Sequence, residues 1–389
     1  MQKRIYADNA ATTKVAPEVV AEMMPYFTEG YGNPSSIYAE GRAAKAAVDK
    51  AREQVAAAIG AESGEIYFTG SGSEADNWAI RSVAKSMKQK GNHIITTAVE
   101  HHAVLHTCQS LEKEGYEVTY LPVDECGKVS AQAVKDAIKD TTILVTVMFA
   151  NNEIGTLMPI AEIGELCKEA GVIFHTDAVQ AIGMVPIDVK AMNIDMLSLT
   201  GHKFHGPKGS GALYVRKGVK LTSFITGGAQ ERNRRAGTEN VPGIVGLGKA
   251  IELATADIPA KAAYLTKLRD AYIQKITDTV PYAYLNGHPT DRLPGNVNFS
   301  FSFIEGEGLL LFLDMKGISA SSGSACTSGS LDPSHVLLAI GRKHEEAHGS
   351  LRISLDTENT MEDIEVIADA VKEIVARLRS MSPLYEGKE

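Results

Sequence analysis

The sequence predicts an α/β protein with two domains. A mostly parallel seven-stranded sheet lies between helices in the large domain, and the smaller domain is α+β. Between about residues 40 and 215, short apolar segments alternate with amphipathic ones. The short segments are almost continuously apolar, which is typical of parallel strands covered by helices on both faces. The pattern breaks near residues 256–261, and 389 residues exceed the usual size of one hydrophobic core. We therefore place the large domain at residues 14–257 and the small domain at residues 1–13 and 258–389.

The expected elements follow one another along the chain in strand–helix order. In the large domain, strands are expected at residues 65–69, 93–98, 117–121, 142–149, 172–176, 196–199 and 211–215. Helices are expected at residues 41–59, 75–88, 104–114, 131–138 and 160–169. In the small domain, a long polar helix after residue 261 precedes strands at 296–302 and 350–354 and helices at 308–315, 334–340 and 361–378.

Charge and cysteine content exclude several classes of protein. The chain has 39 basic and 48 acidic residues, a net charge of −9, so it lacks the positive surface that nucleic-acid binding requires. No apolar stretch approaches the roughly 20 residues of a membrane span, and no signal-peptide core follows the first residues. The four cysteines form no C-x-x-C pair, which favours reduced thiols. We expect a cytoplasmic protein with no nucleic-acid or membrane partner.

Polar side chains follow most of the predicted parallel strands, where the carboxyl ends of the strands meet and ligands usually bind. These segments are 70–74, 100–102, 151–153, 177–180 and 200–203. Each alone is explained as loop or helix-cap chemistry. Together they place a lysine, a carboxylate, a histidine, amides and a glycine-rich anion loop on one edge of the sheet.

This combination fits pyridoxal 5'-phosphate, which needs a Schiff-base lysine, a carboxylate at its ring nitrogen and a phosphate cradle. Lys203 can supply the amine and Asp177 the carboxylate. Gly72 and Ser73 open a helix whose free N–H groups favour a phosphate. Further donors are expected from Thr200 and His202. The alternatives are a surface lysine at 203 and an ordinary helix cap at Ser73.

Two residues of the small domain suggest chemistry of their own. Cys326 lies in a serine- and glycine-rich segment with nothing apolar to pack against, which suggests a reactive thiol on a tether. An incidental loop cysteine is the alternative. Arg352 alternates with apolar neighbours and could clamp a carboxylate, although a structural ion pair is equally compatible with that pattern.

Three other patterns point to different chemistry. Residues 70–75 match the dinucleotide-binding pattern, with Glu100 as a ribose acid, but their strand does not open a fresh βαβ array. Residues 344–348 match H-E-x-x-H, but glycines on both sides leave room for a helix of only a turn or two. His102 and His106 lie one helical turn apart without an indicated third ligand. We expect no metal site.

The motifs as a set resemble those of the cysteine desulfurases, and most closely their NifS-type branch, within the class-V aminotransferase-like enzymes. The resemblance runs nearly end to end and rests on segments 8–13, 32–36, 100–101, 151–153, 175–180, 201–203, 235–240, 321–328 and 350–354. It implies a fold-type I pyridoxal-phosphate transferase that acts as a homodimer. Such an enzyme takes sulfur from L-cysteine, leaves L-alanine and holds the sulfur as a cysteine persulfide.

The resemblance also implies roles for individual residues. Catalytic roles fall to Lys203, which bonds the cofactor, to Cys326, which carries the persulfide, and to His101, which stacks on the ring. Asp177 would bind the ring nitrogen and Gln180 the phenolic oxygen. The phosphate would be held by Gly72, Ser73, Thr200 and His202, with Thr238 reaching it from the partner subunit. Asn152 would contact cofactor and substrate, and Arg352 would bind the substrate carboxylate.

Other functions on this set of residues are a selenocysteine lyase or an aminotransferase, against which the Cys326 segment argues. A protein that only presents a sulfur-accepting thiol is a further alternative, against which Lys203 and Asp177 argue. The expected sulfur acceptor is an iron–sulfur scaffold or another acceptor protein. Whether the sulfur serves nitrogenase, general iron–sulfur assembly or tRNA thiolation is not encoded in the motifs.

Overall fold

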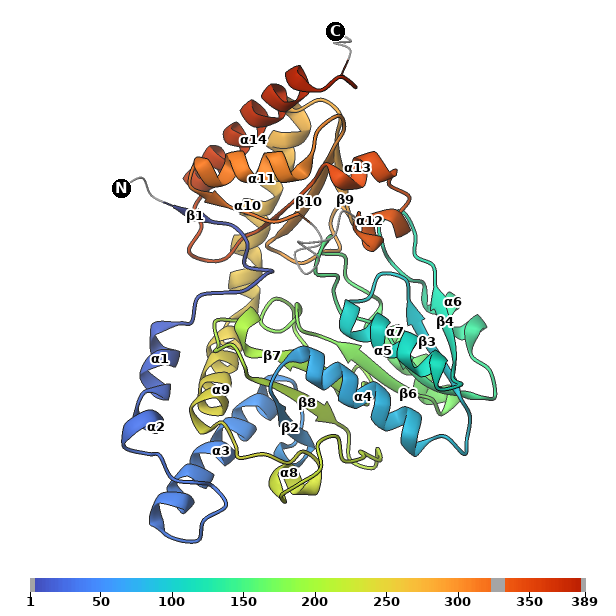
Figure 1. Ribbon diagram of the computed structural model, residues 1–389, viewed down its shortest axis with the longest axis vertical. Coiled ribbons are helices and arrows are strands. Elements are labelled where there is room, and N and C mark those ends of the chain that lie inside the picture. Colours follow the sequence, from blue (N-terminus) through green and yellow to red (C-terminus); the bar gives the residue numbers. More distant parts are fainter. Residues whose placement is uncertain (1–3, 323–332, 386–389) are drawn as a thin grey trace.

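Two lobes, each built around its own sheet, make up the computed structural model, which describes residues 4–322 and 333–385 (Figure 1). The lower lobe in Figure 1 holds the large sheet, and the upper lobe holds the C-terminal elements together with the N-terminal strand β1. Cys326 lies outside the described residues. The predicted α/β fold is confirmed.

The large sheet has seven strands in the order β2-β8-β7-β6-β5-β3-β4. Its strands are β2 (Ile66–Thr69), β3 (His93–Thr97), β4 (Glu117–Leu121), β5 (Thr142–Thr146), β6 (Ile173–Asp177), β7 (Met196–Thr200) and β8 (Gly211–Val215). Only β8 runs antiparallel to its neighbours, so the sheet is mostly parallel as predicted. Each strand lies within or one residue beyond its predicted range.

Helices cover both faces of this sheet because its strands are apolar on both sides. On one face, α4 (Gly72–Ser86) and α5 (His102–Lys113) pack around the buried Trp78. The other face is covered by α1 (Pro17–Met23), α3 (Ala39–Ala58), α6 (Ala131–Ala137), α7 (Ile160–Ala170) and α9 (Val241–Thr255). Two short helices, α2 (Pro25–Thr28) and α8 (Gln230–Asn233), lie at the periphery.

The small lobe has a three-stranded antiparallel sheet in the order β12-β10-β9. Its strands are β9 (Ala283–Asn286), β10 (Asn296–Phe301) and β12 (Ser350–Ser354), and β1 (Ile5–Tyr6) pairs with β11 (Ile318–Ser319) beside it. The helices are α10 (Ile258–Thr279), α11 (Gly306–Met315), α12 (His335–Ala339), α13 (His344–His348) and α14 (Met361–Met381). This lobe has a hydrophobic core of its own, which includes Ile5. The separate cores are consistent with the domain division at residues 13/14 and 257/258, which we retain as a proposal.

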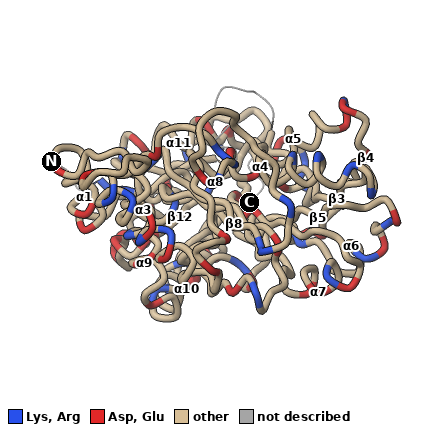
Figure 2. Tube along the Cα trace, turned by 90° about the horizontal axis from the view of Figure 1, so that it is seen from below, with Lys and Arg blue, Asp and Glu red and all other residues tan. Residues whose placement is uncertain are grey.

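Three features of the fold bear on the alternative functions and partners. The H-E-x-x-H pattern forms α13, a helix of five residues, as the flanking glycines predicted. In the view of Figure 2, acidic and basic residues are interspersed along the described part of the chain. No helix in the described part of the chain is long and apolar enough to cross a membrane.

Candidate active site

A cavity of about 330 Å³ lies at the carboxyl-end edge of the large sheet, and residues of both lobes line it. It brings together side chains that are far apart in the sequence. The predicted site residues that line it are Gly72, Ser73, His101, Asn152, Asp177, Gln180, Thr200, His202, Lys203 and Arg352. Ten predicted residues from several segments therefore meet in one cavity. Separate roles as loop residues or helix caps, which were the alternative, do not explain why they meet.

Lys203 is half-buried at the end of a short 3-10 turn that follows β7. Its Nζ donates to the carbonyl oxygens of Ala10 and Ala11 at 2.6 and 2.9 Å. The N-terminal segment therefore folds over the lysine from the far end of the chain. This environment differs from that of an exposed loop lysine, which was the alternative interpretation.

Asp177 is the last residue of β6 and is 6% exposed. Its Oδ1 accepts the backbone N–H of Val179 at 2.9 Å. Burial raises the pKa of Asp177 to about 6, and Lys203 opposes that shift. The protein thus holds a carboxylate out of water where a cationic partner would stabilise its charged form.

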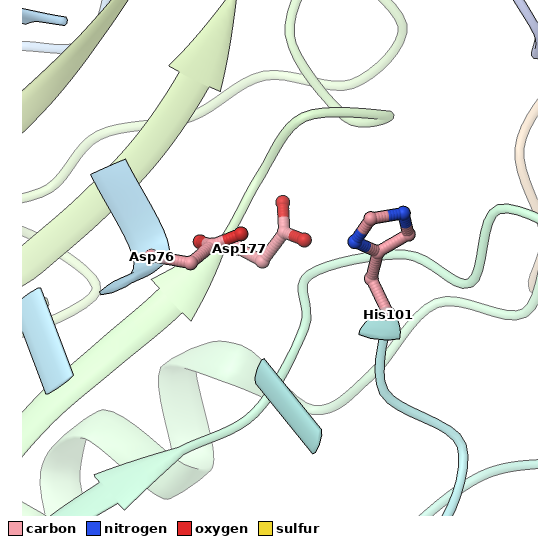
Figure 3. Close-up of side chains that lie close together, drawn as sticks. All are labelled: Asp76, His101 and Asp177. Carbon is pink, nitrogen blue, oxygen red and sulfur yellow. The ribbon is translucent and has the colours of Figure 1, made fainter. Parts of the chain in front are cut away.

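Asp76 on α4 lies beside Asp177 and was not predicted (Figure 3). Burial and the neighbouring Asp177 carboxyl raise the pKa of Asp76. Its buried Oδ1 has no hydrogen-bond partner among the described residues. The ligand atoms of Asp76, Asp177 and His101 lie within 4.8 Å of one another. Three such ligands could hold a metal ion, and the same set also suits a cationic ring nitrogen below a stacked imidazole.

His101 is the N-cap of α5, and its Nδ1 accepts the Ala103 N–H at 3.2 Å. A nitrogen that accepts a hydrogen bond carries no proton, so the ring is neutral and its one proton lies on Nε2. Burial lowers the pKa of His101 to about 4, in agreement with this geometry. The imidazole faces Asp177 across the cavity (Figure 3).

The N-terminus of α4 offers the predicted anion site. Ser71 is the N-cap, and its hydroxyl accepts the Glu74 N–H at 3.1 Å, so Ser73 does not serve as the cap. A Cβ at position 72 would lie 2.7 Å from Val179 Cγ2. Gly72 is therefore needed for the helix end to approach the segment after Asp177, and the free N–H groups point to a phosphate-sized anion.

Thr200 and His202, two of the predicted phosphate ligands, make hydrogen bonds with other groups of the chain in this structure. The Thr200 hydroxyl donates to the Ser210 carbonyl at 3.0 Å, so its proton is engaged by the backbone. His202 Nδ1 lies 3.2 Å from Thr12 Oγ1. Burial lowers the pKa of His202 to about 4, so a neutral imidazole faces the cavity.

Arg352 on β12 is 2% exposed. Its contacts fit both roles that the sequence allowed, a structural ion pair and a binding site for a carboxylate. Its Nη2 pairs with Asp8 Oδ1 at 3.0 Å, and its Nη1 donates to the Asn152 carbonyl at 2.9 Å. Its buried Nε has no acceptor among the described residues. The guanidinium is thus fixed by an ion pair and retains an unmet donor for an anionic ligand.

Two predicted residues do not line the cavity. Thr238 is exposed and borders a separate hollow with Gly70 and Arg235. Cys326 lies outside the described residues, but both described ends of its segment adjoin the site. Ser321 pairs with Arg352 through backbone hydrogen bonds of 2.7 and 3.3 Å, and His335 lines the cavity.

The sequence predicted no individual role at this site for five further residues that border it, namely Asp8, Asp76, His102, Glu153 and His335. Asp76 carries a usable signal, because it follows Gly72 by one helical turn and so shares its face of α4. His335 adds a third imidazole to the pair His102 and His106. The ring centroid of His102 lies 4.9 Å from that of His106 and 4.9 Å from that of His335.

The residues fit pyridoxal phosphate. The buried Asp177 carboxyl, with the unpartnered Asp76 Oδ1 beside it, suits the ring nitrogen. A neutral histidine suits the ring face, and the glycine-dependent helix end suits the phosphate. Lys203 supplies the amine that such a cofactor requires.

Comparison with known proteins gives a consistent family assignment. Residues 5–367 match the family model of class-V aminotransferases. The chain is 61% identical to a cysteine desulfurase IscS of Methanosarcina thermophila over 98% of its own length and 94% of the relative's. It is also 61% identical to a cysteine desulfurase IscS of Clostridium botulinum, over 99% and 98% of the two chains.

Solved structures agree in fold. A NifS-like protein superposes with a TM-score of 0.91 at 38% identity, covering 97% of this chain and 100% of the other. SspA in complex with cysteine gives a TM-score of 0.81 at 40% identity, covering 92% and 100%.

Proposed function

The chain belongs to the class-V aminotransferase family and, within it, to the cysteine desulfurases, and on that basis we propose that it converts L-cysteine to L-alanine with pyridoxal 5'-phosphate and takes up the sulfur on Cys326. One observation carries the proposal. The Lys203 amine, the buried Asp177 carboxyl and the Arg352 guanidinium line a single cavity.

Each part of the cofactor would meet a matching group of the chain. Lys203 would bond its carbonyl carbon, Asp177 its ring nitrogen and His101 the face of its ring. The phosphate would lie at Gly72 and Ser73. When bound, the cofactor supplies an electron sink that lets bonds at the substrate Cα and Cβ break heterolytically.

The chain's own residues bind and orient the amino acid. Arg352 would hold the substrate carboxylate through its unmet Nε, while Asp8 and the Asn152 carbonyl fix the guanidinium plane. Lys203, which the Ala10 and Ala11 carbonyls hold, would take a proton from Cα. His101 is neutral at pH 7 and can accept and return a proton without retaining it.

In the last step, the substrate sulfur would be transferred to Cys326. The Cys326 thiolate attacks the substrate sulfur, an S–S bond forms, and the Cβ–S bond breaks. The electron pair of that bond stays with Cβ, which takes up a proton and becomes the methyl group of alanine. The sulfur remains as a persulfide on Cys326.

Relatives named IscS and a solved relative with bound cysteine support cysteine as the substrate. We propose an iron–sulfur scaffold or a similar acceptor protein as the recipient of the persulfide. We also propose a homodimer, because Thr238 lies outside its own chain's cavity and could reach a partner's phosphate site.

Two substitutions test the proposal. Lys203→Ala should abolish both alanine formation and the visible absorbance of the lysine-bound cofactor. Cys326→Ser should keep that absorbance and its change on cysteine binding, but should stop sulfur transfer, because a serine hydroxyl is not ionised at neutral pH. Cys126→Ser, at a half-buried cysteine away from the cavity, is the matched control and should behave as wild type.

Three results would contradict it. Alanine formation at the normal rate by Lys203→Ala would exclude the lysine assignment. Full alanine formation by Cys326→Ser would favour a lyase that releases sulfide or selenide directly. Protein without cofactor absorbance that still accepts sulfur from a donor would favour the sulfur-accepting adaptor.

A further inference from the structure

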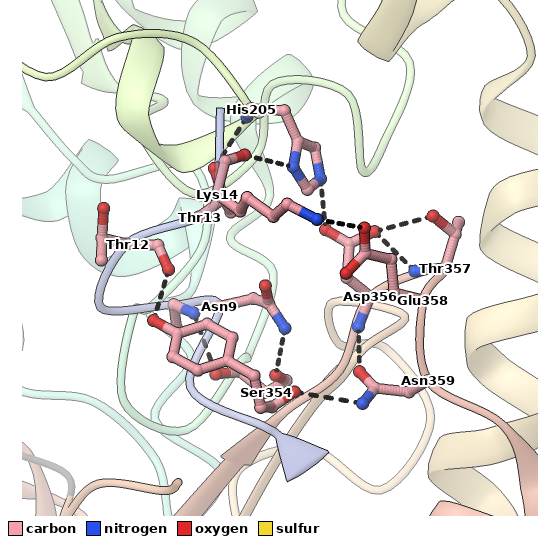
Figure 4. Close-up of polar contacts among 12 residues, drawn as sticks. Asn9, Thr12, Thr13, Lys14, His205, Ser354, Asp356, Thr357, Glu358 and Asn359 are labelled. Carbon is pink, nitrogen blue, oxygen red and sulfur yellow. Dashed lines mark hydrogen bonds and ion pairs between the residues drawn. The ribbon is translucent and has the colours of Figure 1, made fainter. Parts of the chain in front are cut away.

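His205 lies two residues after Lys203 and has a left-handed backbone, with φ of +65°. Its imidazole joins three segments of the chain (Figure 4). Nδ1 lies 2.9 Å from the carbonyl oxygen of Lys14, and Nε2 lies 2.6 Å from Asp356 Oδ2. Asp356 is buried and follows β12, the strand that carries Arg352, by two residues.

The contacts define the protonation state of His205. Both partners, a carbonyl oxygen and a carboxylate, can only accept hydrogen bonds. Both ring nitrogens must therefore carry hydrogen, so the side chain is an imidazolium cation in this structure. Asp356 is ionised opposite it, and its other oxygen accepts the backbone N–H of Thr357 at 2.6 Å.

His205 also binds the N-terminal segment to the lysine loop through its backbone. Its N–H donates to Thr13 Oγ1 at 2.8 Å, and its carbonyl oxygen accepts the Ala16 N–H at 3.0 Å. The same segment supplies the Ala10 and Ala11 carbonyls that hold Lys203 Nζ. At its other side, the Ala10 N–H donates to the Ser354 hydroxyl of β12 at 2.9 Å.

We propose that His205 is a positioning residue. In its cationic form it clamps the Lys203 loop, the N-terminal segment and the end of the Arg352 strand to one another. The pair thereby fixes the spacing between the amine of one lobe and the carboxylate-binding guanidinium of the other. The inference rests on the proposed function, which requires both groups to hold one amino acid.

The pair can titrate, because it borders a cavity of about 400 Å³ that also meets Lys14, Lys208 and Glu358. The hydrogen bond to Asp356 raises the pKa of His205 above its usual 6.5, while burial and, to a smaller extent, Lys261 oppose that shift. His205 in turn helps to lower the pKa of Asp356 to about 2, against burial. The contribution of the pair is therefore complete below about pH 6.5 and is lost as pH rises through the raised pKa of His205.

The test compares His205→Asn, Asp356→Asn and the double variant as cofactor-loaded enzymes. Asparagine tolerates the left-handed backbone at 205, and at 356 it keeps the shape while removing the charge. The matched control is Glu358→Gln, which removes the exposed Lys14–Glu358 pair between the same segments. kcat and KM for cysteine, and the midpoint of thermal unfolding, are measured between pH 6 and 9.

Each single variant should lower kcat/KM for cysteine about tenfold at pH 6.5, mainly by raising KM, and the double variant should lose no more than either single one. As pH rises, the ratio of kcat/KM between wild type and Asp356→Asn should decrease toward one. The difference between their midpoints of thermal unfolding should decrease toward zero over the same pH range. Glu358→Gln should match wild type.

Additive losses, or a ratio that does not change with pH, would overturn the proposal, and Asp356→Asn alone decides this if His205→Asn does not fold. The unfolding measurement separates this failure from failure of the proposed function. If neither wild type nor any variant forms alanine from cysteine, the desulfurase assignment is wrong. The pH-dependent difference in thermal unfolding still reports on the His205–Asp356 pair.

Discussion

Glu100 shows how strongly burial acts on a single side chain next to the site. The sequence pattern allowed a ribose-binding acid at this position. The structure instead buries its carboxyl completely, where Oε1 accepts the Thr97 hydroxyl at 2.7 Å and the Met148 N–H at 3.0 Å. Burial raises the pKa of Glu100 to about 8 despite these two hydrogen bonds. A residue that stays protonated at neutral pH cannot serve as a ribose-binding carboxylate.

Glu100→Gln should flatten the dependence of stability on pH. With the folded pKa raised from 4.5 to about 8, the folded state holds a proton that the unfolded state releases over that interval. Stability therefore falls with rising pH, by up to about 1.4 kcal/mol per pH unit for this one group. Glutamine removes that term while keeping the shape. Urea unfolding of wild type and variant at pH 5, 6, 7 and 8 measures the difference.

The exposed Glu125 gives the control, since Glu125→Gln should leave the profile parallel to that of wild type. A Glu100→Gln profile that is also parallel to wild type would show that Glu100 ionises normally in the folded protein.

Residue types at strand ends made Lys203 and Asp177 predictable, because the edge where parallel strands end can be inferred from periodicity. Arg352 was predictable from its alternation with apolar neighbours within β12. Asp8 could not be assigned by periodicity, since its contact with Arg352 spans 344 positions of sequence. The same limit applies to His205, whose role depends on Asp356 beyond the domain boundary. Pairs that join the two lobes depend on how the lobes pack, which local patterns do not encode.

At the scale of elements, α8 is held in a strained shape. Glu231, Arg232 and Asn233 have φ of 43°, 57° and 62°, three successive left-handed residues that side chains disfavour. The buried Arg52 of α3 pairs with both carboxylate oxygens of Glu231 at 2.8 Å. Glu231 also accepts the Phe68 N–H of β2 at 3.1 Å. This segment leads directly to Thr238.

Breaking that pair should cost considerably more than breaking an exposed one. Glu231→Gln should lower the free energy of unfolding by about 3–5 kcal/mol, because it leaves the buried Arg52 charge without a charged partner. Urea unfolding measures the loss. The exposed Lys50–Glu22 pair uses the same helix α3, so Glu22→Gln should change stability by less than about 1 kcal/mol. Equal losses in the two variants would refute the structural role of the Arg52–Glu231 pair.

Elements escaped prediction where local propensity and packing disagree. The helix α9 contains three glycines, which weaken a helix. Packing requires a glycine at 248, because a Cβ there would lie 2.7 Å from the backbone Cα of Ala51. The strand β9 is only four residues long and mostly half-exposed, so it shows no clear periodicity.

At the scale of the whole molecule, two surface features are not explained by contacts within a single chain. Large apolar side chains are exposed in the segment from α2 to the start of α3, among them Tyr31 at 72% and Ile37 at 90%. Exposed apolar groups of this kind mark interaction surfaces. Thr238, in turn, lies outside its own chain's cavity. A second copy that covers the apolar segment and receives Thr238 at its phosphate site would explain both observations.

Mixing two inactive proteins tests the shared site. Lys203→Ala disables the site that holds the lysine, whereas Thr238→Ala should disable the site of the partner. In a mixed dimer one site carries both lesions and the other carries neither. Random exchange of subunits should therefore restore about a quarter of wild-type alanine formation. The matched control mixes the Lys203→Ala/Thr238→Ala double variant with Lys203→Ala, a mixture in which every site lacks the lysine and none can recover. Subunit exchange is verified with two affinity tags. If the tags show mixed dimers but no activity returns, Thr238 acts within its own chain or not at all, and the apolar segment must then serve another contact.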